Sequence, residues 1–365
     1  MIRNEKFPDP LDQEETDLLL PTAWKSGSLK YGELELLAEG GTAKVYLTDD
    51  NNLGRTVAYK TLHTDLQDST VESQRFLREA RVTANIQHPG TLPVYELGRD
   101  RAGQLFFTMK KVDGRDLSKI LFDLKQEVPE IVDEFSLPRL LDILIQVCQT
   151  LAFAHDRGVI HRDLKPANII IGKFGEVYVL DWGLAKVMGS TSIIDKDEYE
   201  DSEDKKTLQL TPVGRHYGTP LYMSPEIARG DDDLDSRSDV FSLGIILYEM
   251  LTLDSFMKGK DIVEIKKKLL EENYPLPREH SKKSEIPRDL EAVCLKALKR
   301  NKLERYSSVT NLISDLQKYR HGEEVSVYWY SGWEKLVRWN HKKAYWLIAL
   351  LSALAGALIN AYLGN

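Results

Sequence analysis

A carboxylate and a carboxamide stand five residues apart in the run HRDLKPAN, as Asp163 and Asn168. A carboxylate in such a run can accept the proton of an attacking hydroxyl, and an amide oxygen can bind a divalent cation. An apolar stretch at residues 169–171 follows at once and is typical of a buried strand. The run therefore indicates acid–base and metal chemistry, against the plainer interpretation of a surface turn with a salt bridge.

A second carboxylate, Asp181, follows the apolar residues 179–180 and precedes Trp182 and Gly183. An Asp that ends a strand can present its carboxylate to magnesium. Three residues alone are weak support, but their position shortly after the first run strengthens the prediction that Asp181 is a metal ligand.

Lys60 and Glu79 supply charges of opposite sign upstream of both runs. Lys60 ends the strand-like run VAYK, and Glu79 lies within the helical run RFLREA. A buried lysine needs an opposite charge if it is to stay protonated and in place. Alone, the two residues would more simply be surface charges. Their position ahead of the two runs above favours a buried ion pair instead.

In this order the motifs resemble those of the protein kinase family, over about residues 31–321. Three runs, NNLGRTVAYK, RFLREARVTANIQHPGTLPVYELG and GTPLYMSPE, are most similar to the bacterial eukaryotic-like (Hanks-type) serine/threonine protein kinases. The resemblance implies an α+β, bilobal protein kinase fold with a small β-rich N-lobe (residues 31–112) and a larger helical C-lobe (residues 113–321). It also implies ATP between the lobes, with Mg²⁺ or, in its place, Mn²⁺.

The resemblance assigns each residue a part in phosphoryl transfer, which needs positioned phosphates, divalent cations and an oriented hydroxyl. Asp163 orients and deprotonates the acceptor hydroxyl. Asn168 and Asp181 hold the metal. Lys60, fixed by Glu79, grips the α- and β-phosphates.

The family's glycine-rich loop, G-x-G-x-x-G-x-V, corresponds to AEGGTAKV at residues 38–45. Gly40 keeps the middle glycine, whereas Ala38 and Ala43 replace the other two. Glycine lets backbone amides approach phosphates closely and permits positive φ, so the alanines predict a looser contact.

Met109 corresponds to the gatekeeper, and residues 110–112 correspond to the hinge that meets the adenine. Hinge bonds use backbone groups, so the unusual Lys110 and Lys111 are not expected to prevent binding. The residues that the resemblance places around the nucleotide are Leu37, Ala38, Gly40, Gly41, Val45, Ala58, Lys60, Met109, Lys110 and Val112.

Further assignments concern the substrate and the support of the loops. Lys165 resembles the lysine of serine/threonine-specific kinases and stabilises the transferring group. Thr219 belongs to the Gly-Thr-Pro loop that docks the substrate. We expect Glu226 to pair with Arg305, and Asp239 to anchor the catalytic loop from a buried helix.

Arg162 precedes the proposed base and indicates regulation, because an arginine there often binds a phosphorylated activation-loop residue in this family. Thr211 is the expected autophosphorylation site, with Thr207 and Ser202 as secondary candidates. The acidic block at residues 195–204 could mimic or repel that phosphate, although a solvated loop is the simpler interpretation.

Hydrophobic periodicity supports strands first and helices later, which is an α+β arrangement. Strands are expected within residues 31–62, 92–97 and 105–112, and helices over 71–86, 137–158 and 240–252. The last of these is apolar nearly all round, which is typical of a buried helix. Residues 189–217 are polar and are expected to form a long loop.

The composition narrows the class of protein. A net charge of −8 over 365 residues argues against a nucleic-acid partner, because neutralising phosphates needs a basic face. Cys148 and Cys294 lie in apolar helical patterns, which predicts buried thiols in a reducing cytosol. Residues 1–30 are acidic and contain three prolines, so we expect a disordered tail without a signal peptide.

The C-terminus differs from the rest, because residues 344–365 contain no charged side chain. Their length matches the ~20 residues of a membrane span. Basic and aromatic residues crowd the preceding segment, as they do at membrane interfaces. We predict a transmembrane helix at residues 344–363 after a juxtamembrane segment at residues 322–343, and the alternative is a buried core helix.

These observations predict a single-pass protein of the cytoplasmic membrane, with the kinase in the cytoplasm acting on Ser and Thr of protein substrates. A homodimer would permit autophosphorylation in trans. One alternative is a membrane-anchored pseudokinase scaffold, which only Ala38, Ala43 and Trp182 support. The other is a small-molecule phosphotransferase, which the expected pair of Glu226 and Arg305 opposes.

Overall fold

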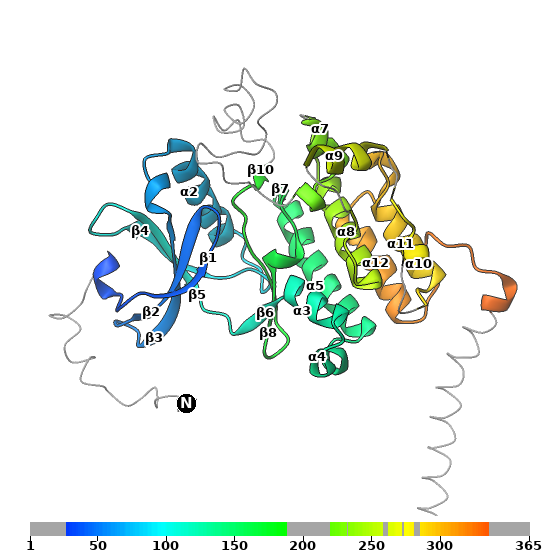
Figure 1. The fold of residues 1–365 in the computed structure, drawn as a ribbon, viewed down its shortest axis with the longest axis horizontal. Helices are drawn as coiled ribbons and strands as arrows, with labels where there is room; N and C mark the ends of the chain where they lie inside the picture. The colour runs from blue at the N-terminus through cyan, green and yellow to red at the C-terminus, as the bar shows by residue number, and fades with distance from the viewer. Residues whose placement is uncertain are drawn as a thin grey trace, which may run out of the picture. The chain divides into compact units, whose positions relative to one another are not determined.

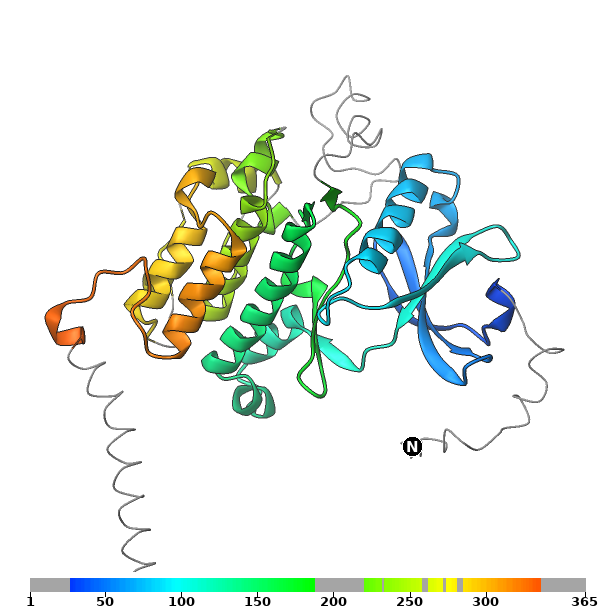
Figure 2. The same cartoon turned by 180° about the vertical axis from the view of Figure 1, so that it is seen from behind.

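The computed structural model describes residues 27–187, 220–231, 233–257, 262–271, 274–280 and 285–335. These residues form two compact units. The first contains the described residues up to Gly114 and those from Gly172 to 187, and the second contains Arg115–Ile171 and those from 220 to 335. Strands dominate the first unit and helices the second (Figure 1, Figure 2). The predicted α+β content is therefore confirmed.

The first unit is built on an antiparallel sheet of five strands in the order β1-β2-β3-β5-β4. The strands are β1 (Glu35–Glu39), β2 (Ala43–Asp50), β3 (Arg55–Leu62), β4 (Val94–Arg99) and β5 (Leu105–Lys110). In the turn between β2 and β3, the backbone N–H of Asn52 donates to Asp50 Oδ1 at 3.2 Å. Gly54 follows with a φ of 61°, a conformation that glycine adopts without strain. The turn joins two antiparallel strands within the range where strands are predicted.

Regular structure is present in residues that the sequence assigns to a disordered tail. Residues Gly27–Lys30 form a single 3₁₀ turn, η1. The Lys30 ammonium lies 2.8 Å from the Glu96 carboxylate, and the Tyr31 hydroxyl donates to the same carboxylate at 2.7 Å. These contacts tie η1 to β4, so the predicted disordered tail is wrong for its last four residues. Residues 1–26 lie outside the described part of the chain.

Helix α2 (Thr70–Asn85) forms where periodicity predicts a helix. Ser69 caps it by accepting the backbone N–H of Glu72 at 3.3 Å, which satisfies one donor of the first turn. Phe76 and Ala80 are buried one turn apart and pack in one cluster with Phe107 of β5. This apolar contact fixes α2 on the sheet.

Residues 172–187 group with the first unit, whereas the sequence assigns them to the C-lobe. The backbone N–H of Val179, in strand β9 (Val177–Val179), donates to Gly90 O at 2.8 Å. Nearby, the N–H of Lys173 donates to Asp113 O at 3.1 Å. These long-range bonds place Asp181, which follows β9, in the same unit as Lys60.

Helices make up most of the second unit. They are α3 (Leu117–Lys125), α4 (Pro129–Glu134), α5 (Leu137–Asp156), α7 (Pro225–Arg229), α8 (Arg237–Thr252), α9 (Ile262–Glu271), α10 (Pro277–His280), α11 (Arg288–Ala297) and α12 (Val309–Arg320). Shorter elements are β6 (Gly114–Asp116), β7 (Val159–Ile160), η3 (Pro166–Asn168), β8 (Ile169–Gly172), η4 (Pro220–Tyr222) and η5 (Lys302–Glu304).

Helix α8 forms the core of this unit. Every residue from Ser238 to Thr252 is buried, as the apolar pattern predicts. Helices α5, α11 and α12 pack against it. Gly244 permits the approach of α11, because a Cβ at that position would stand 2.9 Å from the Cβ of Ala297.

Helix α5 is, within the described residues, the one helix long and apolar enough to cross a membrane. Its buried residues, from Leu140 to Ala154, identify it instead as a core helix. It ends before Gly158, whose φ is 71°. Cys148 on α5 and Cys294 on α11 are both buried, as predicted. The predicted span at residues 344–363 lies outside the described residues.

Candidate active site

Lys60 and Glu79 meet in the first unit. Lys60 lies near the end of β3, and its ammonium donates to the carboxylate of Glu79 on α2. Their side chains are only 17% and 13% exposed, so each charge needs the other. Burial alone would lower the pKa of Lys60, but the carboxylates of Glu79 and Asp181 raise it above its ordinary value. The ammonium is therefore charged at neutral pH.

Asp181 lies beside this pair. Its φ is 62°, a left-handed conformation that is uncommon outside glycine and is often found at functional sites. A Cβ built on Gly183 would lie 3.3 Å from Asp181 Oδ1 and 3.8 Å from Glu79 Oε2. Glycine at 183 thus leaves room for two neighbouring carboxylates. Glu79 accepts from the Lys60 ammonium, and Asp181 is the carboxylate of the two that the sequence predicts as a metal ligand.

Trp182 stands where the DFG motif of protein kinases has phenylalanine. Its side chain is fully buried, and its indole N–H donates to Val179 O at 3.3 Å. A buried indole needs such an acceptor, because an unpaired N–H is costly away from water. The larger aromatic ring is therefore accommodated with its polar atom satisfied.

The glycine-rich loop is the tight turn between β1 and β2. The backbone N–H of Gly40 donates to Ala43 O at 2.9 Å. Positive φ is absent from Gly40 and Gly41, and from Ala38 and Ala43, which lie in the two strands. The backbone of this turn therefore accommodates alanine at positions 38 and 43 without strain.

His63, which the sequence did not single out, holds this turn. Its backbone N–H donates to Thr42 O at 3.0 Å, and its Nε2 lies 2.8 Å from Gly40 O. Its Nδ1 lies 3.6 Å from the Glu39 carboxylate, and the side chain is buried. The only signal in the sequence is a histidine three residues after Lys60, which by itself does not indicate a contact with a turn more than twenty residues away.

The hinge residues occupy the end of β5 and the chain beyond it. Met109 pairs with Ala58 across β3 and β5 and packs against the apolar cluster of the unit. The Lys110 ammonium donates to the Tyr178 hydroxyl at 2.6 Å, and this bond raises its pKa. Lys111 lies 3.4 Å from the Asp113 carboxylate. The unusual lysines are thus engaged by side chains of their own unit.

The second unit brings together the other predicted catalytic groups. The Lys165 ammonium donates to Asp163 Oδ2 at 2.7 Å, with both side chains largely buried. The amide nitrogen of Asn168, in η3, donates to the backbone carbonyl of Asp163 at 2.9 Å. This bond uses the amide nitrogen and sets the orientation of the carboxamide, whose oxygen is the predicted metal ligand.

Asp239 of α8 binds the backbone of the loop that contains Asp163. Its carboxylate accepts the backbone N–H groups of His161 and Arg162 at 2.9 and 3.0 Å, and lies 2.7 Å from His155 Nε2. Burial is complete and opposes ionisation, yet the His155 and His161 donors hold the pKa of Asp239 below its usual value. Arg162, whose N–H makes one of these bonds, has a φ of 67°. The anchor implied by the resemblance is present, and His155 is an addition that the sequence did not reveal.

Glu226 and Arg305 form a second buried ion pair. Arg305 donates to both carboxylate oxygens at 2.7 Å, and its remaining N–H groups reach the backbone carbonyls of residues 237, 299 and 300. Ser238 Oγ donates to the same carboxylate at 2.9 Å. Burial alone would raise the pKa of Glu226, but Arg305 holds it below its ordinary value. A charge pair with all its donors used fixes α7 on the unit.

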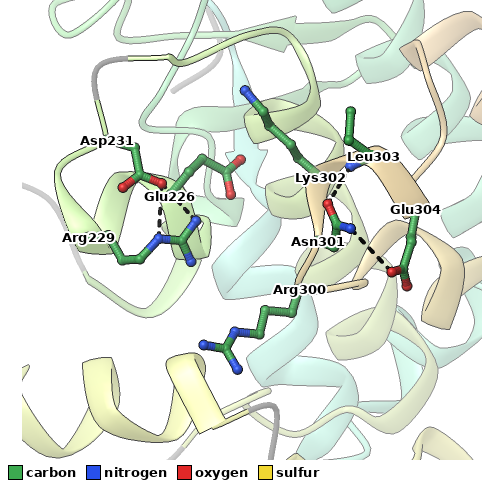
Figure 3. A pocket seen from close by; sticks show the side chains of 8 residues that line it. All are labelled: Glu226, Arg229, Asp231, Arg300, Asn301, Lys302, Leu303 and Glu304. Atoms are coloured by element: carbon green, nitrogen blue, oxygen red, sulfur yellow. Dashed lines mark hydrogen bonds and ion pairs between the residues drawn. The ribbon is translucent and has the colours of Figure 1, made fainter.

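A cavity of about 400 Å³ opens beside this pair. Charged side chains make up most of its wall (Figure 3). Arg229 is paired within it to Asp231 at 2.7 Å, and Asn301 caps η5 by accepting the N–H of Leu303. The cavity is thus lined largely by groups that stabilise one another.

The predicted metal ligands, Asn168 and Asp181, belong to different units. Both offer an oxygen donor, which is the ligand type that Mg²⁺ prefers. In the described part of the chain, no group of three His, Cys, Asp or Glu side chains could hold a metal by itself. The regulatory and docking candidates Thr207, Thr211 and Thr219, with Ser202, lie outside the described residues.

Comparison with known proteins places these groups in a family context. The family of protein kinase domains matches residues 31–317. Serine/threonine-protein kinase PknD of Protochlamydia amoebophila is 36% identical over 296 residues, covering 80% of this chain and 30% of that protein. PknD of Chlamydia pneumoniae is 37% identical over 301 residues, covering 80% and 31%. The chain spans about a third of the length of these curated relatives.

Replacing His63 by alanine tests its hold on the turn. The change removes the side-chain bond to Gly40, worth about 1 kcal/mol, so the amides of residues 40–43 should exchange with solvent about fivefold faster. Thr56→Ala is the control, because it removes the 2.9 Å bond to Asp49 at the far end of β3. Unchanged exchange at residues 40–43 in His63→Ala would show that the turn does not depend on this side chain.

Replacing Glu226 by glutamine tests the buried ion pair. Because the folded-state pKa of Glu226 lies below 4.5, its contribution to stability is complete above that value and is lost as pH falls through the lower pKa. Urea unfolding at about pH 7 should show a loss of about 3 kcal/mol, and the gap to the native protein should narrow below about pH 4. Exposed Glu279→Gln should change neither value. A pH-independent gap would contradict this assignment.

Proposed function

Because the chain belongs to the family of protein kinase domains, we propose that it transfers the γ-phosphoryl group of ATP to serine and threonine hydroxyls of proteins. The observation that carries the proposal is the loop of the second unit, where the carboxylate of Asp163 accepts from Lys165 and the buried Asp239 holds the two preceding backbone N–H groups. A carboxylate placed so rigidly is suited to orient a hydroxyl.

In the proposed reaction, Asp163 accepts the proton of the substrate hydroxyl as its oxygen attacks the γ-phosphorus. The bond from that phosphorus to the bridging oxygen breaks, and ADP leaves. Lys165, 2.7 Å from Asp163, neutralises charge on the transferring group. Lys60, held by Glu79, binds the α- and β-phosphates.

A divalent cation fits the oxygen donors that the chain offers. Asn168 would hold it through its amide oxygen, because the amide nitrogen is used by Asp163 O. Asp181 would hold it through its carboxylate. When bound, Mg²⁺, or Mn²⁺ in its place, neutralises charge on the β- and γ-phosphates. The nucleotide is proposed to lie against the turn at residues 38–45, with its adenine on the hinge at 110–112.

Protein substrates are favoured over small molecules by two features. Lys165 is typical of serine/threonine-specific kinases. The buried pair of Glu226 and Arg305 supports the segment that follows the Gly-Thr-Pro loop, which the resemblance assigns to substrate docking.

The chain keeps the four polar groups that phosphoryl transfer needs, which are Lys60, Asp163, Asn168 and Asp181. Their presence disfavours a pseudokinase scaffold.

We further propose that residues 344–363 span the cytoplasmic membrane once, after the segment at 322–343, with the kinase in the cytoplasm. The uncharged C-terminal stretch and the basic residues before it support this arrangement. The kinase domain is proposed to cover residues 31–321, and two copies would meet transiently if autophosphorylation occurs in trans.

Replacing Asp163 by asparagine tests the proposed reaction. The full chain, with labelled ATP, a generic protein substrate and Mg²⁺, should lose kcat by about 10²–10⁴-fold, because general-base catalysis contributes about that much. The matched control is Asp156→Asn, whose side chain is 85% exposed at the end of α5, and it should keep full activity. A normal kcat in Asp163→Asn, with unchanged circular dichroism, would contradict the proposal.

Thr211 is the proposed site of activating autophosphorylation, and Arg162 the proposed partner of its phosphate. Mass spectrometry of the purified full chain should find phosphate on Thr211, with Thr207 as the second site. Asp163→Asn protein made in the same host should carry none there. Fully active protein with unmodified Thr211 would end this part of the proposal.

A further inference from the structure

Two tryptophans stand almost wholly in water on the segment of residues 323–335, here called the C-terminal collar. Trp329 is 91% exposed and Trp333 is 73% exposed. Single exposed apolar side chains are ordinary on protein surfaces, but two exposed indoles four residues apart on one short segment place a large apolar area in water. Such exposure is informative where the segment itself is held in place.

The collar is fastened to the helical unit. Val325 and Tyr330 are buried, and the Tyr330 hydroxyl donates to Asp289 Oδ2 at 3.0 Å. The backbone N–H and the hydroxyl of Ser326 donate to the two oxygens of Asp315, at 2.8 and 2.7 Å. These contacts reach α11 and α12. Exposure of the two indoles is therefore a property of an ordered segment.

A second set of bonds shapes the turn that bears the tryptophans. Glu334 accepts the backbone N–H and the hydroxyl of Ser331 at 2.7 and 2.8 Å. Its other oxygen accepts the Tyr328 hydroxyl at 2.9 Å, and the Tyr328 and Tyr330 rings meet edge to face at 4.8 Å. The tyrosines face the protein and are engaged, whereas the neighbouring tryptophans are not covered.

The chain beyond the collar indicates what could cover them. Eight residues, 336–343, separate the collar from the uncharged stretch at 344–365. A fully extended connection of that length reaches at most about 30 Å. If residue 344 enters a bilayer, the collar must therefore lie within about 30 Å of the bilayer surface.

The collar sits at an edge of the helical unit, next to α10 and α11 and away from α3 (Figure 1, Figure 2). A tether at this edge favours an orientation in which this face of the unit lies next to the bilayer. On the collar itself, the ammonium of Lys335 lies 3.1 Å from the Glu324 carboxylate, so this lysine adds little net charge for attraction to lipid. Indoles, by contrast, have an apolar body with a polar N–H and favour the boundary between lipid and water.

We propose that Trp329 and Trp333 insert into the headgroup region of the membrane and dock the collar face of the kinase on the lipid surface. The proposal rests on the transmembrane helix of the proposed function. A second copy of the chain is the less suitable occupant, because two indoles supply far less than the roughly 800 Å² per partner of a stable protein interface. Docking would fix how the kinase unit stands above the membrane.

The test uses the full chain with single cysteines that carry an environment-sensitive dye, at Trp329→Cys and, separately, at Trp333→Cys. Native Cys148 and Cys294 are fully buried, and burial raises the pKa of both thiols, so they should not take the dye. Phe122→Cys on α3, 61% exposed in the native chain, is the matched control. Each protein is reconstituted into vesicles of phosphatidylcholine and phosphatidylglycerol, and kinase activity checks that it is folded.

Docking predicts a shift of dye emission to shorter wavelength at 329 and 333. Spin-labelled lipid should quench these dyes, and aqueous iodide should lose its effect on them. The dye at 122 should show the opposite. Iodide-quenched dyes at 329 and 333 would overturn the proposal, and so would dyes shielded from both quenchers, because a protein surface would then cover them.

A parallel extraction of the vesicles with alkaline carbonate separates this outcome from failure of the anchor. Protein that resists extraction with its dyes in water would leave the transmembrane helix standing and remove the docking. Protein released by carbonate with its dyes in water would remove both. Released protein whose dyes had contacted lipid would support the docking and remove the span.

Discussion

An ionised carboxylate in the core of the helical unit needs hydrogen-bond donors around it. For Asp239, the loop that carries the proposed base supplies them. Its oxygens accept two backbone N–H groups of that loop and contact His155. Leaving such a charge unpaired would cost several kcal/mol. If the loop moved away from α8, the buried carboxylate of Asp239 would lose its hydrogen-bond donors. Arg162, in this loop, has a left-handed backbone conformation. The buried charge of Asp239 thus helps to set the position of Asp163, through the two backbone N–H groups that precede it.

The strand-rich unit obeys the same constraint with other groups. Lys60 is mostly buried and stays charged because Glu79 and Asp181 surround it with negative charge. Helix α2 brings Glu79 to β3 only because Phe76 and Ala80 pack on the sheet. Apolar packing thus positions a buried ion pair, whose cation is the proposed phosphate-binding group. In both units, moving the proposed catalytic group would leave a buried charge without its partner, which is unfavourable.

Local pattern was enough to predict the elements that carry these groups. The helix at α2 and the buried helix α8 follow from periodicity, and strands β2 and β3 lie within the range where strands are expected. Motif order along the chain also paired Lys60 with Glu79. Contacts between distant segments were out of reach, because nothing near His63 in the sequence indicates Gly40. For the same reason the grouping of residues 172–187 with the strands was missed, since it depends on bonds to Gly90 and Asp113.

The most direct measurement is a double-mutant cycle on kcat with Asp163→Asn and Asp239→Asn, in the full chain and under saturating ATP. If Asp239 acts by holding the loop that presents Asp163, the two residues work as one unit, and their effects are far from additive. We predict that Asp239→Asn lowers kcat strongly in protein that keeps its helical circular dichroism, and that the double variant is no slower than Asp163→Asn alone. Losses that multiply in the double variant, or an Asp239→Asn protein with normal kcat, would contradict this account.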